Sequence, residues 1–318
     1  MTADKIAELP DGLHVTLCGA GGPLPDRLRS APCVAIVAGD SLYLVDAGSG
    51  AARNLIAVGY QPSDVEAVFL THFHSDHIDG LGELGMMRWI AGSHRLPLPL
   101  VGAEGVREIV QGLNQTYRLD SIYRTAHHGP EVAPPTGSGF SVRDFSEPAD
   151  GAATVVFDKD GLRVTMFKVE HSPVSPAVGY RFDYGGRSIV VSGDTSRSEN
   201  LTLHAADADL LLHDSLSPEL MSVIGEAATA VGNRGLARIS SDVLEYHASP
   251  VEAAETAEAA GVGHLLLYHI VPPMPIPGLS TIFMKGVAEA YGGPVTLGRD
   301  GTAISLPSGS DEIRVLSY

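Results

Sequence analysis

Four residues of metal-ligating types lie within six positions of one another in the segment Thr71–His77. His72 and His74 are separated by one residue, so on an extended turn their imidazoles face the same way and can share one ion. Asp76 and His77 follow directly and turn toward a second position. This spacing is rare by chance, and neutral imidazole with carboxylate is a ligand set typical of zinc. We therefore predict a metal site in this segment.

The elements around this segment predict how it is held. The apolar run at 65–70 has the length and composition of a strand buried on both faces, and it ends directly at the histidine segment. Helical spacing follows at 80–91 and 103–117, and Ser249 is the expected N-cap of a helix over 249–260. Further strand-like runs lie at 13–18, 33–39, 41–48, 162–169, 178–184, 187–194, 208–214 and 264–269.

Strands alternate with helices in both halves of the chain, and this order predicts a two-sheet sandwich flanked by helices. No low-complexity linker divides the sequence, so we expect a single domain over residues 1–318. The segment at about 118–150 is rich in Pro, Gly and paired histidines. We predict that this segment is an irregular insertion or lid on that domain.

The composition limits the partners of the protein. It has 21 basic and 38 acidic residues, a formal net charge of −17, so long nucleic acid is not an expected partner unless a local basic patch overrides the field. Cys18 and Cys33 lie in apolar runs and are predicted to be buried free thiols, with a disulfide as the alternative. Residues 1–10 lack the apolar core of a signal peptide, and no apolar run reaches the roughly 18 residues of a membrane span. We expect a cytoplasmic protein with no membrane partner.

Three later strand ends carry residues of the same types. His171 follows a strand-like run, Asp194 closes another, and His269 closes the last interior one. Together with Asp-Ala-Gly-Ser-Gly at 46–50, these positions resemble the metallo-β-lactamase superfamily, and the resemblance covers about residues 13–306. It implies an α/β fold in which two mixed sheets, flanked by helices, form a four-layer αββα sandwich.

The resemblance also implies a complete dinuclear metal site. One metal is expected on His72, His74 and His171, the other on Asp76, His77 and His269, with Asp194 bridging the two. The expected cofactors are two Zn²⁺ ions per chain, with Mn²⁺ or iron as alternatives. A hydroxide bridging the metals would then be the nucleophile and Asp76 would orient it.

Two further residues indicate which branch of the superfamily the chain resembles. His247 precedes the helix at 249–260, and Asp214 ends a strand-like run. Both resemble positions in the branch of the tRNA 3′-processing (RNase Z-like) nucleases, the arylsulfatase-like enzymes and related phosphodiesterases. That branch implies that His247 assists the leaving group and that Asp214 orients it, although the nucleases usually carry the longer Glu there. His213 is interpreted as structural, and a homodimer is expected because it is common in this branch.

The substrate is less defined. Only 23 positions (194 − 171) separate His171 from Asp194, which leaves no room for the basic arm that grips RNA in the short nucleases. With the net charge, this favours a small anionic or aromatic ester, an aryl sulfate or phosphodiester. The segment 116–128 resembles the matching segment of arylsulfatase-like members. The expected substrate contacts are Trp89, Tyr117, Arg118, Tyr123, Arg124, His127 and His128.

Other functions stay open at this point. An RNase Z-like endoribonuclease or phosphodiesterase acting on RNA would use the same metal site. An acyl-homoserine lactonase shares the metal set but typically adds a pocket tyrosine that we cannot assign. A weak β-lactamase activity is disfavoured, because many true members carry Cys where Asp194 stands. A non-enzymatic scaffold would be expected to have lost ligands, and all seven are present here.

Overall fold

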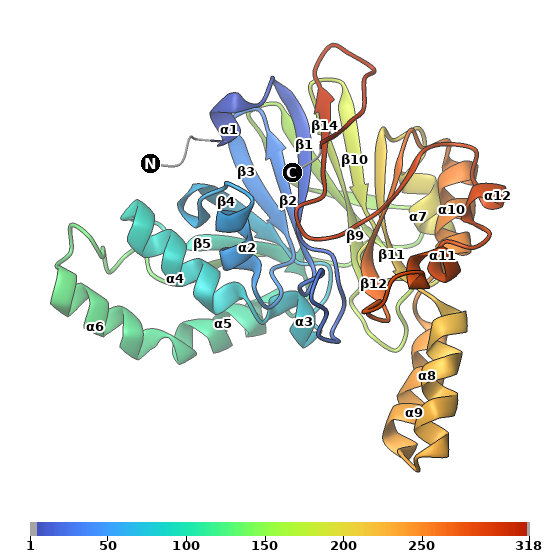
Figure 1. Ribbon diagram of the computed structural model, residues 1–318. Helices are drawn as coiled ribbons and strands as arrows, with labels where there is room; N and C mark the ends of the chain where they lie inside the picture. The colour runs from blue at the N-terminus through green and yellow to red at the C-terminus, as the bar shows by residue number, and fades with distance from the viewer. Residues whose placement is uncertain (1–4, 317–318) are drawn as a thin grey trace.

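In the computed structural model, which describes residues 5–316, two β-sheets pack face to face and carry helices on their outer faces (Figure 1). The first sheet has, in spatial order, β15 (Arg314–Leu316), β14 (Ala303–Pro307), β1 (Gly12–Gly19), β2 (Cys33–Ala38), β3 (Ser41–Val45), β4 (Val65–Phe69), β5 (Leu98–Ala103) and β6 (Phe140–Phe145). The second sheet has β13 (Val295–Leu297), β12 (Leu265–Val271), β11 (Leu210–Leu216), β10 (Arg187–Val191), β9 (Val178–Tyr184), β8 (Leu162–Lys168) and β7 (Ala153–Lys159).

Each sheet changes from antiparallel to parallel pairing. In the first sheet β1 to β3 pair antiparallel, and β3 to β6 pair parallel. In the second sheet β7 to β10 pair antiparallel, and β10 to β13 pair parallel. The carboxyl ends of neighbouring parallel strands meet at one edge of a sheet, and loops there bring side chains from distant parts of the chain together.

Apolar side chains fill the space between the sheets and on both outer faces. The central cluster joins side chains of the two sheets: Phe69 of β4 packs against Tyr180 and Phe182 of β9, with ring centroids 5.5 and 5.3 Å apart. A second cluster lies between the first sheet and its helices, and a third between the second sheet and its helices. These three cores confirm the predicted layered α/β sandwich.

Helices cover the outer face of each sheet (Figure 1). The capping box predicted at Ser249 is present, because the Ser249 hydroxyl accepts from the Glu252 amide and the Glu252 carboxylate accepts from the Ser249 amide. This capping box begins α10 (Pro250–Ala260). The other α-helices of the described residues are α1 (Lys5–Glu8), α2 (Ala51–Ala57), α3 (Ser75–Ile78), α4 (Leu81–Gly92), α5 (Val106–Thr116), α6 (Arg118–His128), α7 (Glu199–His204), α8 (Pro218–Ala230), α9 (Arg234–Asp242), α11 (Leu279–Phe283) and α12 (Val287–Ala290).

The segment 118–150 differs from the irregular lid predicted above. Its first part is α6, a continuation of α5, and its last part includes β6, the edge strand of the first sheet. Asn114 fixes the return of the chain, because its side chain exchanges two hydrogen bonds of 2.9 Å with the backbone of Phe140. Residues 129–139 and 146–150 of the segment lack regular structure. The prediction also left 215–245 unassigned, where α8 and α9 form a helical hairpin that projects from the body (Figure 1).

The two cysteines are not free. Cys18 and Cys33 form a disulfide between β1 and β2, with Cα atoms 5.0 Å apart, and both are fully buried. The register of these antiparallel strands shifts between Leu17 and Gly19, and Gly19 pairs with Cys33. This irregularity places Cys18 beside Cys33, a proximity that the spacing of the two residues in the sequence does not reveal.

No helix in the described part of the chain has both the length and the apolar character needed to cross a membrane.

Candidate metal centre

The predicted ligands converge at the carboxyl ends of strands from both sheets. The histidine segment follows β4 of the first sheet, and His74 precedes the short helix α3 that carries Asp76 and His77. From the second sheet, His171 follows β8, Asp194 follows β10, and His269 lies within β12. The structure therefore brings all seven predicted ligands together from four separate places in the chain.

Asp46 organises the histidine segment from the end of β3. The amide and the hydroxyl of Thr71 donate to its carboxylate, at 2.9 and 2.8 Å, and His77 Nδ1 lies 2.8 Å from the same group. His72 Nδ1 lies 3.1 Å from the Thr71 hydroxyl oxygen. These contacts leave the Nε2 atoms of His72 and His77 to point into the site.

Asp46 is a residue of the site that was not predicted from the sequence, although the motif that contains it is part of the family resemblance. An Asp followed by Ala-Gly after a strand is also a common turn, so its type alone gave no signal. Its backbone has φ 58°, which a non-glycine residue adopts rarely, and its carboxylate is almost completely buried.

The histidines from the second sheet are fixed by the backbone. His171 Nδ1 donates to the carbonyl oxygen of Tyr246 at 2.8 Å, so its Nε2 points into the site. His269 occupies an irregularity of β12: Asp214 pairs with Tyr268 and Ser215 with Ile270, which leaves His269 without a partner in the ladder. Its φ of 46° lies in the left-handed region, which costs a non-glycine residue about 1–3 kcal/mol. Such strain at a convergent side chain is typical of a functional position.

One carboxylate oxygen lies between the two sets of imidazoles. Asp194 Oδ2 is 3.2 Å from Nε2 of both His77 and His269. It is 3.8 Å from His72 Nε2 and 4.0 Å from His171 Nε2. Two ligand atoms that share a tetrahedral zinc ion lie roughly 3.4 Å apart, given metal–ligand distances near 2.1 Å. The separations at Asp194 are thus close to those of atoms sharing metal ions.

The charge states suit a divalent cation. Burial lowers the pKa of His72 well below its usual value, so the imidazole keeps a lone pair. Burial opposes ionisation of Asp194, but the imidazoles of His269 and His77 outweigh it and hold the pKa of that carboxyl well below its usual range. Burial also disfavours a charged His77, yet Asp194 and Asp46 outweigh this effect and raise its pKa. Protons therefore compete with a cation at His77 as the pH falls.

The donor set fits metal ions on a structural criterion as well. Buried polar atoms in proteins almost always have a hydrogen-bond partner. Among the described residues, Nε2 of His77, His171 and His269 is buried without one, and so are Asp76 Oδ2 and Asp194 Oδ1. The potential ligand atoms of His72, His74, His171 and Asp194 lie within 4.8 Å of one another, and so do those of Asp76, His77 and His269.

His247 and Asp214 form a pair beside these groups. His247 Nδ1 donates to Asp214 Oδ2 at 3.0 Å, so its Nε2 is directed away from that carboxylate. The contact forms although Asp is shorter than the Glu usual in the nucleases. The other oxygen, Asp214 Oδ1, lies 3.1 Å from His213 Nδ1. Burial works against ionisation of Asp214, but hydrogen bonds from His213 and His247 outweigh it and lower the pKa of that carboxyl.

A cavity of about 250 Å³ opens over this centre. Asp76, Asp194, His247 and His269 lie on its floor and walls, and the turn before α10 contributes Val243 and Tyr246. Sequence reasoning missed these two residues, because they carry no metal-ligating group. The cavity is lined by Pro23, His74, Ser75, Asp76, Asp194, Val243, Tyr246, His247, His269 and Val271.

Two glycines allow the loop after β3 to pack on the histidine segment. A Cβ atom on Gly48 would overlap the carbonyl oxygen of Asp76, and one on Gly80 would overlap the carbonyl oxygen of Gly48. The chain can approach this closely only where no side chain is present. Gly48 thus packs on the backbone of Asp76, and Gly80 packs on the backbone of Gly48.

The predicted substrate contacts lie elsewhere. None of the seven, all of which are described, lines the cavity at the metal centre. Trp89 is buried and its Nε1 donates to the Pro134 carbonyl at 2.8 Å, so it supports the chain rather than forming a wall. Arg124 pairs with Asp120 at 2.8 Å. The other five are on or beside α6: Tyr117, Arg118, Tyr123, His127 and His128.

The fold and this centre together define a metal-dependent hydrolase of a known class. The family model described as the β-lactamase superfamily domain matches residues 42–270. The chain belongs to the metallo-β-lactamase superfamily, in its ribonuclease Z-like branch.

Named relatives support this assignment. The chain is 34% identical over 290 residues to a ribonuclease Z of Mycobacterium avium (strain 104), an alignment that covers 91% of this chain and 96% of that protein. It is 35% identical over 289 residues to a ribonuclease Z of Mycobacterium sp. (strain KMS), covering 91% and 94%.

Solved structures share the fold. The short form of human tRNase Z has a TM-score of 0.66 at 21% identity, covering 92% of this chain and 99% of that one. The metallo-β-lactamase fold protein YhfI from Bacillus subtilis also has a TM-score of 0.66 at 21% identity, covering 93% and 100%.

Proposed function

We propose that this protein is a dinuclear metal-dependent phosphodiesterase that cleaves RNA, as the name of its ribonuclease Z relatives suggests. The observation that carries the proposal is the position of Asp194 Oδ2, within 4.0 Å of four imidazole nitrogens, next to the His247–Asp214 pair. The ribonuclease Z relatives match 91% of the chain, and they favour RNA as the substrate over the aryl sulfate expected from the sequence.

In this proposal seven side chains hold two metal ions. His72, His74 and His171 would hold one, Asp76, His77 and His269 the other, and Asp194 both. Zinc is the expected metal, because the set is rich in imidazole. When bound, the two ions would activate water and stabilise the negative charge that develops on the phosphoryl group. The assigned ligands are His72, His74, Asp76, His77, His171, Asp194 and His269.

His247 is the proposed general acid. Its Nδ1 hydrogen bond to Asp214 fixes the ring orientation and directs Nε2 away from the carboxylate, where it can donate a proton to the departing oxygen. The buried Asp214 carboxylate would stabilise the imidazolium form, because both groups lie in a region with little water. Asp76 is proposed to orient the attacking water through Oδ2, which is buried without a hydrogen-bond partner.

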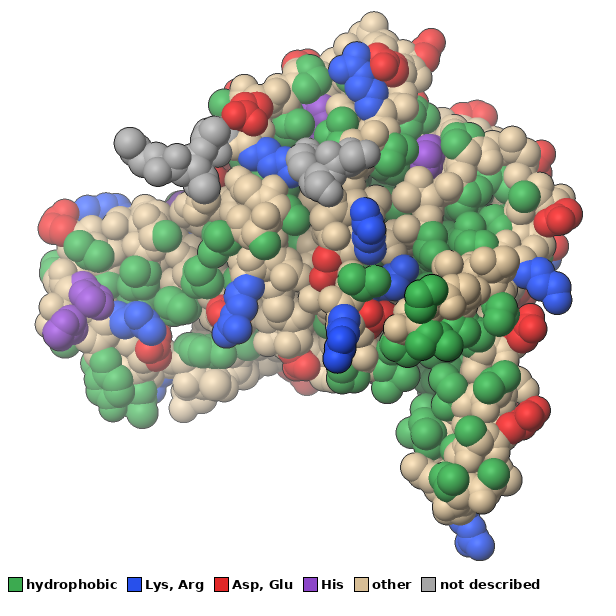
Figure 2. Space-filling model, in the orientation of Figure 1, with side chains coloured by type: hydrophobic (Ala, Val, Ile, Leu, Met, Phe, Trp, Pro, Cys, Tyr) green, Lys and Arg blue, Asp and Glu red, His purple; other side chains and the backbone are tan. Residues whose placement is uncertain are grey.

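A group of arginines, which we call the arginine rim, offers positive charge to RNA phosphates although the net charge of the protein is negative. We use this name for Arg27 and Arg299, with Arg29 as a buried support of the same loop that pairs with Asp26 at 3.6 Å. Arg27 and Arg299 are exposed, with no ion pair between either of them and any described residue. Arg29 Nε donates to the Gly298 carbonyl, so the loop that carries it touches the turn of Arg299. Figure 2 shows several Lys and Arg side chains, with Asp and Glu among them, in the middle of the face in view. We propose that phosphate groups of RNA contact Arg27 and Arg299.

A small phosphodiester or aryl sulfate is the second candidate substrate. The connection between His171 and Asp194 contains β9, β10 and short loops, so a gripping arm is absent from this described segment. The net charge of −17 also disfavours long polyanions outside the arginine rim.

The test compares three substrates on one metal-analysed batch: a precursor tRNA with a 3′ trailer, bis(p-nitrophenyl) phosphate and an aryl sulfate. We expect about two zinc ions per chain and specific cleavage of the tRNA. The Asp194→Ala protein, prepared identically, controls for contaminating nuclease. Turnover of the small diester without tRNA cleavage would reject RNA and leave the second candidate. Failure on every substrate with full metal content would contradict the phosphodiesterase proposal.

A further inference from the structure

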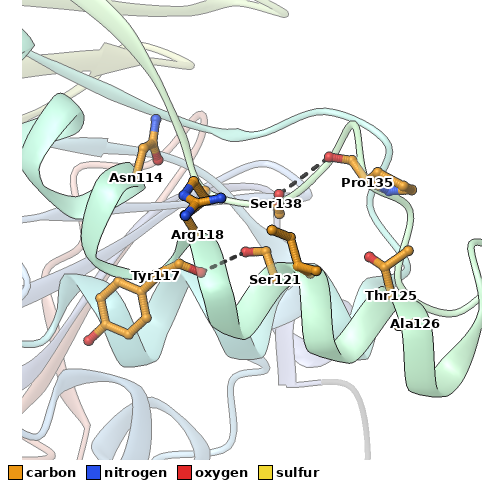
Figure 3. Close-up of a pocket in the computed structure, with 10 residues that line it drawn as sticks. Asn114, Tyr117, Arg118, Ser121, Thr125, Ala126, Pro135 and Ser138 are labelled. Carbon is orange, nitrogen blue, oxygen red and sulfur yellow. Dashed lines mark hydrogen bonds between the residues drawn. The ribbon is translucent and has the colours of Figure 1, made fainter.

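A second cavity lies beside α6. Its volume is about 590 Å³, within the range of small-molecule sites, and it separates α6 from the segment that returns to β6. Figure 3 shows Asn114 and Arg118 at one end and Thr125, Ala126 and Pro135 at the other. The lining residues are Asn114, Tyr117, Arg118, Ser121, Ile122, Thr125, Ala126, Pro135, Ser138 and Gly139.

The cavity is distinct from the metal centre. The two sets of lining residues have no member in common. A site here therefore goes beyond the proposed phosphodiesterase and does not rest on it.

The walls of this cavity are apolar and held in place. Ile122, Ala126 and Pro135 contribute hydrocarbon surface, and Tyr117 contributes its ring. The Tyr117 ring packs directly on α4 at Gly82, where a Cβ atom would overlap it. This wall is therefore supported by the body of the protein although no side chain of α6 is fully buried.

Most polar groups of the cavity already have partners. The hydroxyls of Ser121, Thr125 and Ser138 donate to backbone carbonyls at 3.1, 2.9 and 3.3 Å. The amide of Asn114 is used by both of its hydrogen bonds to Phe140. A ligand that needs hydrogen-bond donors from these groups would have to break existing bonds, which disfavours a neutral, highly polar occupant.

Arg118 is the exception. Its guanidinium makes no hydrogen bond or ion pair with any residue that the structure describes, and Figure 3 shows it extending from the start of α6 toward the side of Ser138. Arg124 on the same helix is by contrast neutralised by Asp120. The cavity thus combines an apolar body with one available cation, and a guanidinium binds carboxylate, sulfonate or phosphate oxygens in a planar, bidentate way.

We propose that this cavity, the α6 cavity, binds a small molecule with an aromatic or other apolar body and one anionic group, which pairs with Arg118. The apolar body would lie between Ile122, Ala126 and Pro135. The overall charge of −17 repels anions in general, so binding of such a molecule depends on the local guanidinium.

The test uses the metal-loaded full chain and two fluorescent probes that differ in charge, anilinonaphthalene sulfonate and neutral phenylnaphthylamine. We expect Arg118→Gln to raise the Kd of the sulfonate probe about tenfold and to leave the Kd of the neutral probe nearly unchanged. Ala126→Trp fills the cavity and should abolish saturable binding of both probes. Arg124→Gln, which removes the paired arginine of the same helix, is the matched control and should change neither.

Three outcomes would overturn the proposal. Equal sulfonate binding by the wild-type and Arg118→Gln proteins would show that the guanidinium is not used. Saturable binding of both probes that survives Ala126→Trp would place the dyes on another surface. A dimer that Ala126→Trp converts to a monomer, measured by light scattering, would show that a second copy fills the cavity. Circular dichroism of each variant ensures that a lost signal reflects the cavity and not unfolding.

Discussion

The metal centre and the α6 cavity are built on opposite principles. At the metal centre, buried nitrogen and oxygen atoms from distant strands point at one another and lack hydrogen-bond partners. In the α6 cavity the hydroxyl and amide groups are satisfied by nearby backbone, and one arginine is left. In the first arrangement several buried polar atoms need ions as partners, whereas in the second only Arg118 is left for a ligand. The centre should therefore be sensitive to single substitutions, and the α6 region tolerant of them.

Replacing Asp194 should have the largest effect. Asp194→Ala removes the oxygen between both sets of imidazoles, so we expect less than one metal ion per chain and a loss of turnover of at least about 10³-fold. Elemental analysis and single-turnover cleavage check this. Asp183→Ala, which removes a half-buried carboxylate that pairs with Arg181 and is not among the ligands, is the control. A variant that retains two equivalents of metal would contradict the ligand assignment.

His247→Ala should reduce turnover without changing the metal content. General acid catalysis contributes typically 10²–10⁴-fold, so we expect a loss of about 10²-fold or more on diesters with poor leaving groups. Diesters with good leaving groups need less protonation and should lose much less. A uniform loss across a leaving-group series would assign His247 a binding role instead.

A substitution of Asp46 tests whether its contacts with His77 and Thr71 increase the affinity of the centre for metal. Asp46→Asn weakens the contacts to His77 and Thr71, and loss of such supporting contacts typically reduces metal affinity by about 10–100-fold. A competitive chelator titration measures this. Asp79→Asn, an exposed position just after α3, should bind metal as the wild type does. Equal affinity of the two variants would show that Asp46 only shapes the turn.

The smallest effect is expected next to the α6 cavity. Trp89→Phe removes one hydrogen bond to the Pro134 carbonyl, which leaves that buried acceptor without its donor and should cost about 1–3 kcal/mol of unfolding free energy. Metal content should stay at the wild-type value. Urea unfolding followed by circular dichroism measures the change. Loss of metal in this variant would contradict the independence of the two regions.

The sequence predicted the sandwich, and the residues that converge at the candidate metal centre, for the same physical reason. Strands buried on both faces read as apolar runs, and ligands that follow such runs are easily located. Residues set by tertiary contacts were not predictable in this way. Asp46 has the type of an ordinary turn residue, and Cys18 reaches Cys33 only through a strand irregularity.

The helical hairpin and α6 escaped prediction for a related reason. Many of their apolar side chains are exposed: Val223 and Ile239 are 60% and 57% exposed, and Tyr123 is 62% exposed. Periodicity identifies a helix best where one face is buried, so such weakly packed helices give a weaker signal.

Gly48 and Gly80 have a consequence for reading a mutational scan of this protein. Neither contributes a ligand atom, yet Gly48 leaves space for the carbonyl oxygen of Asp76, and Gly80 leaves space for the carbonyl oxygen of Gly48. Substituting either with alanine should eliminate function about as completely as substituting a histidine ligand. A map of tolerated amino acids would therefore mark chemically inert positions as strongly as reactive ones, and only elemental analysis of the folded variants would tell the two kinds apart.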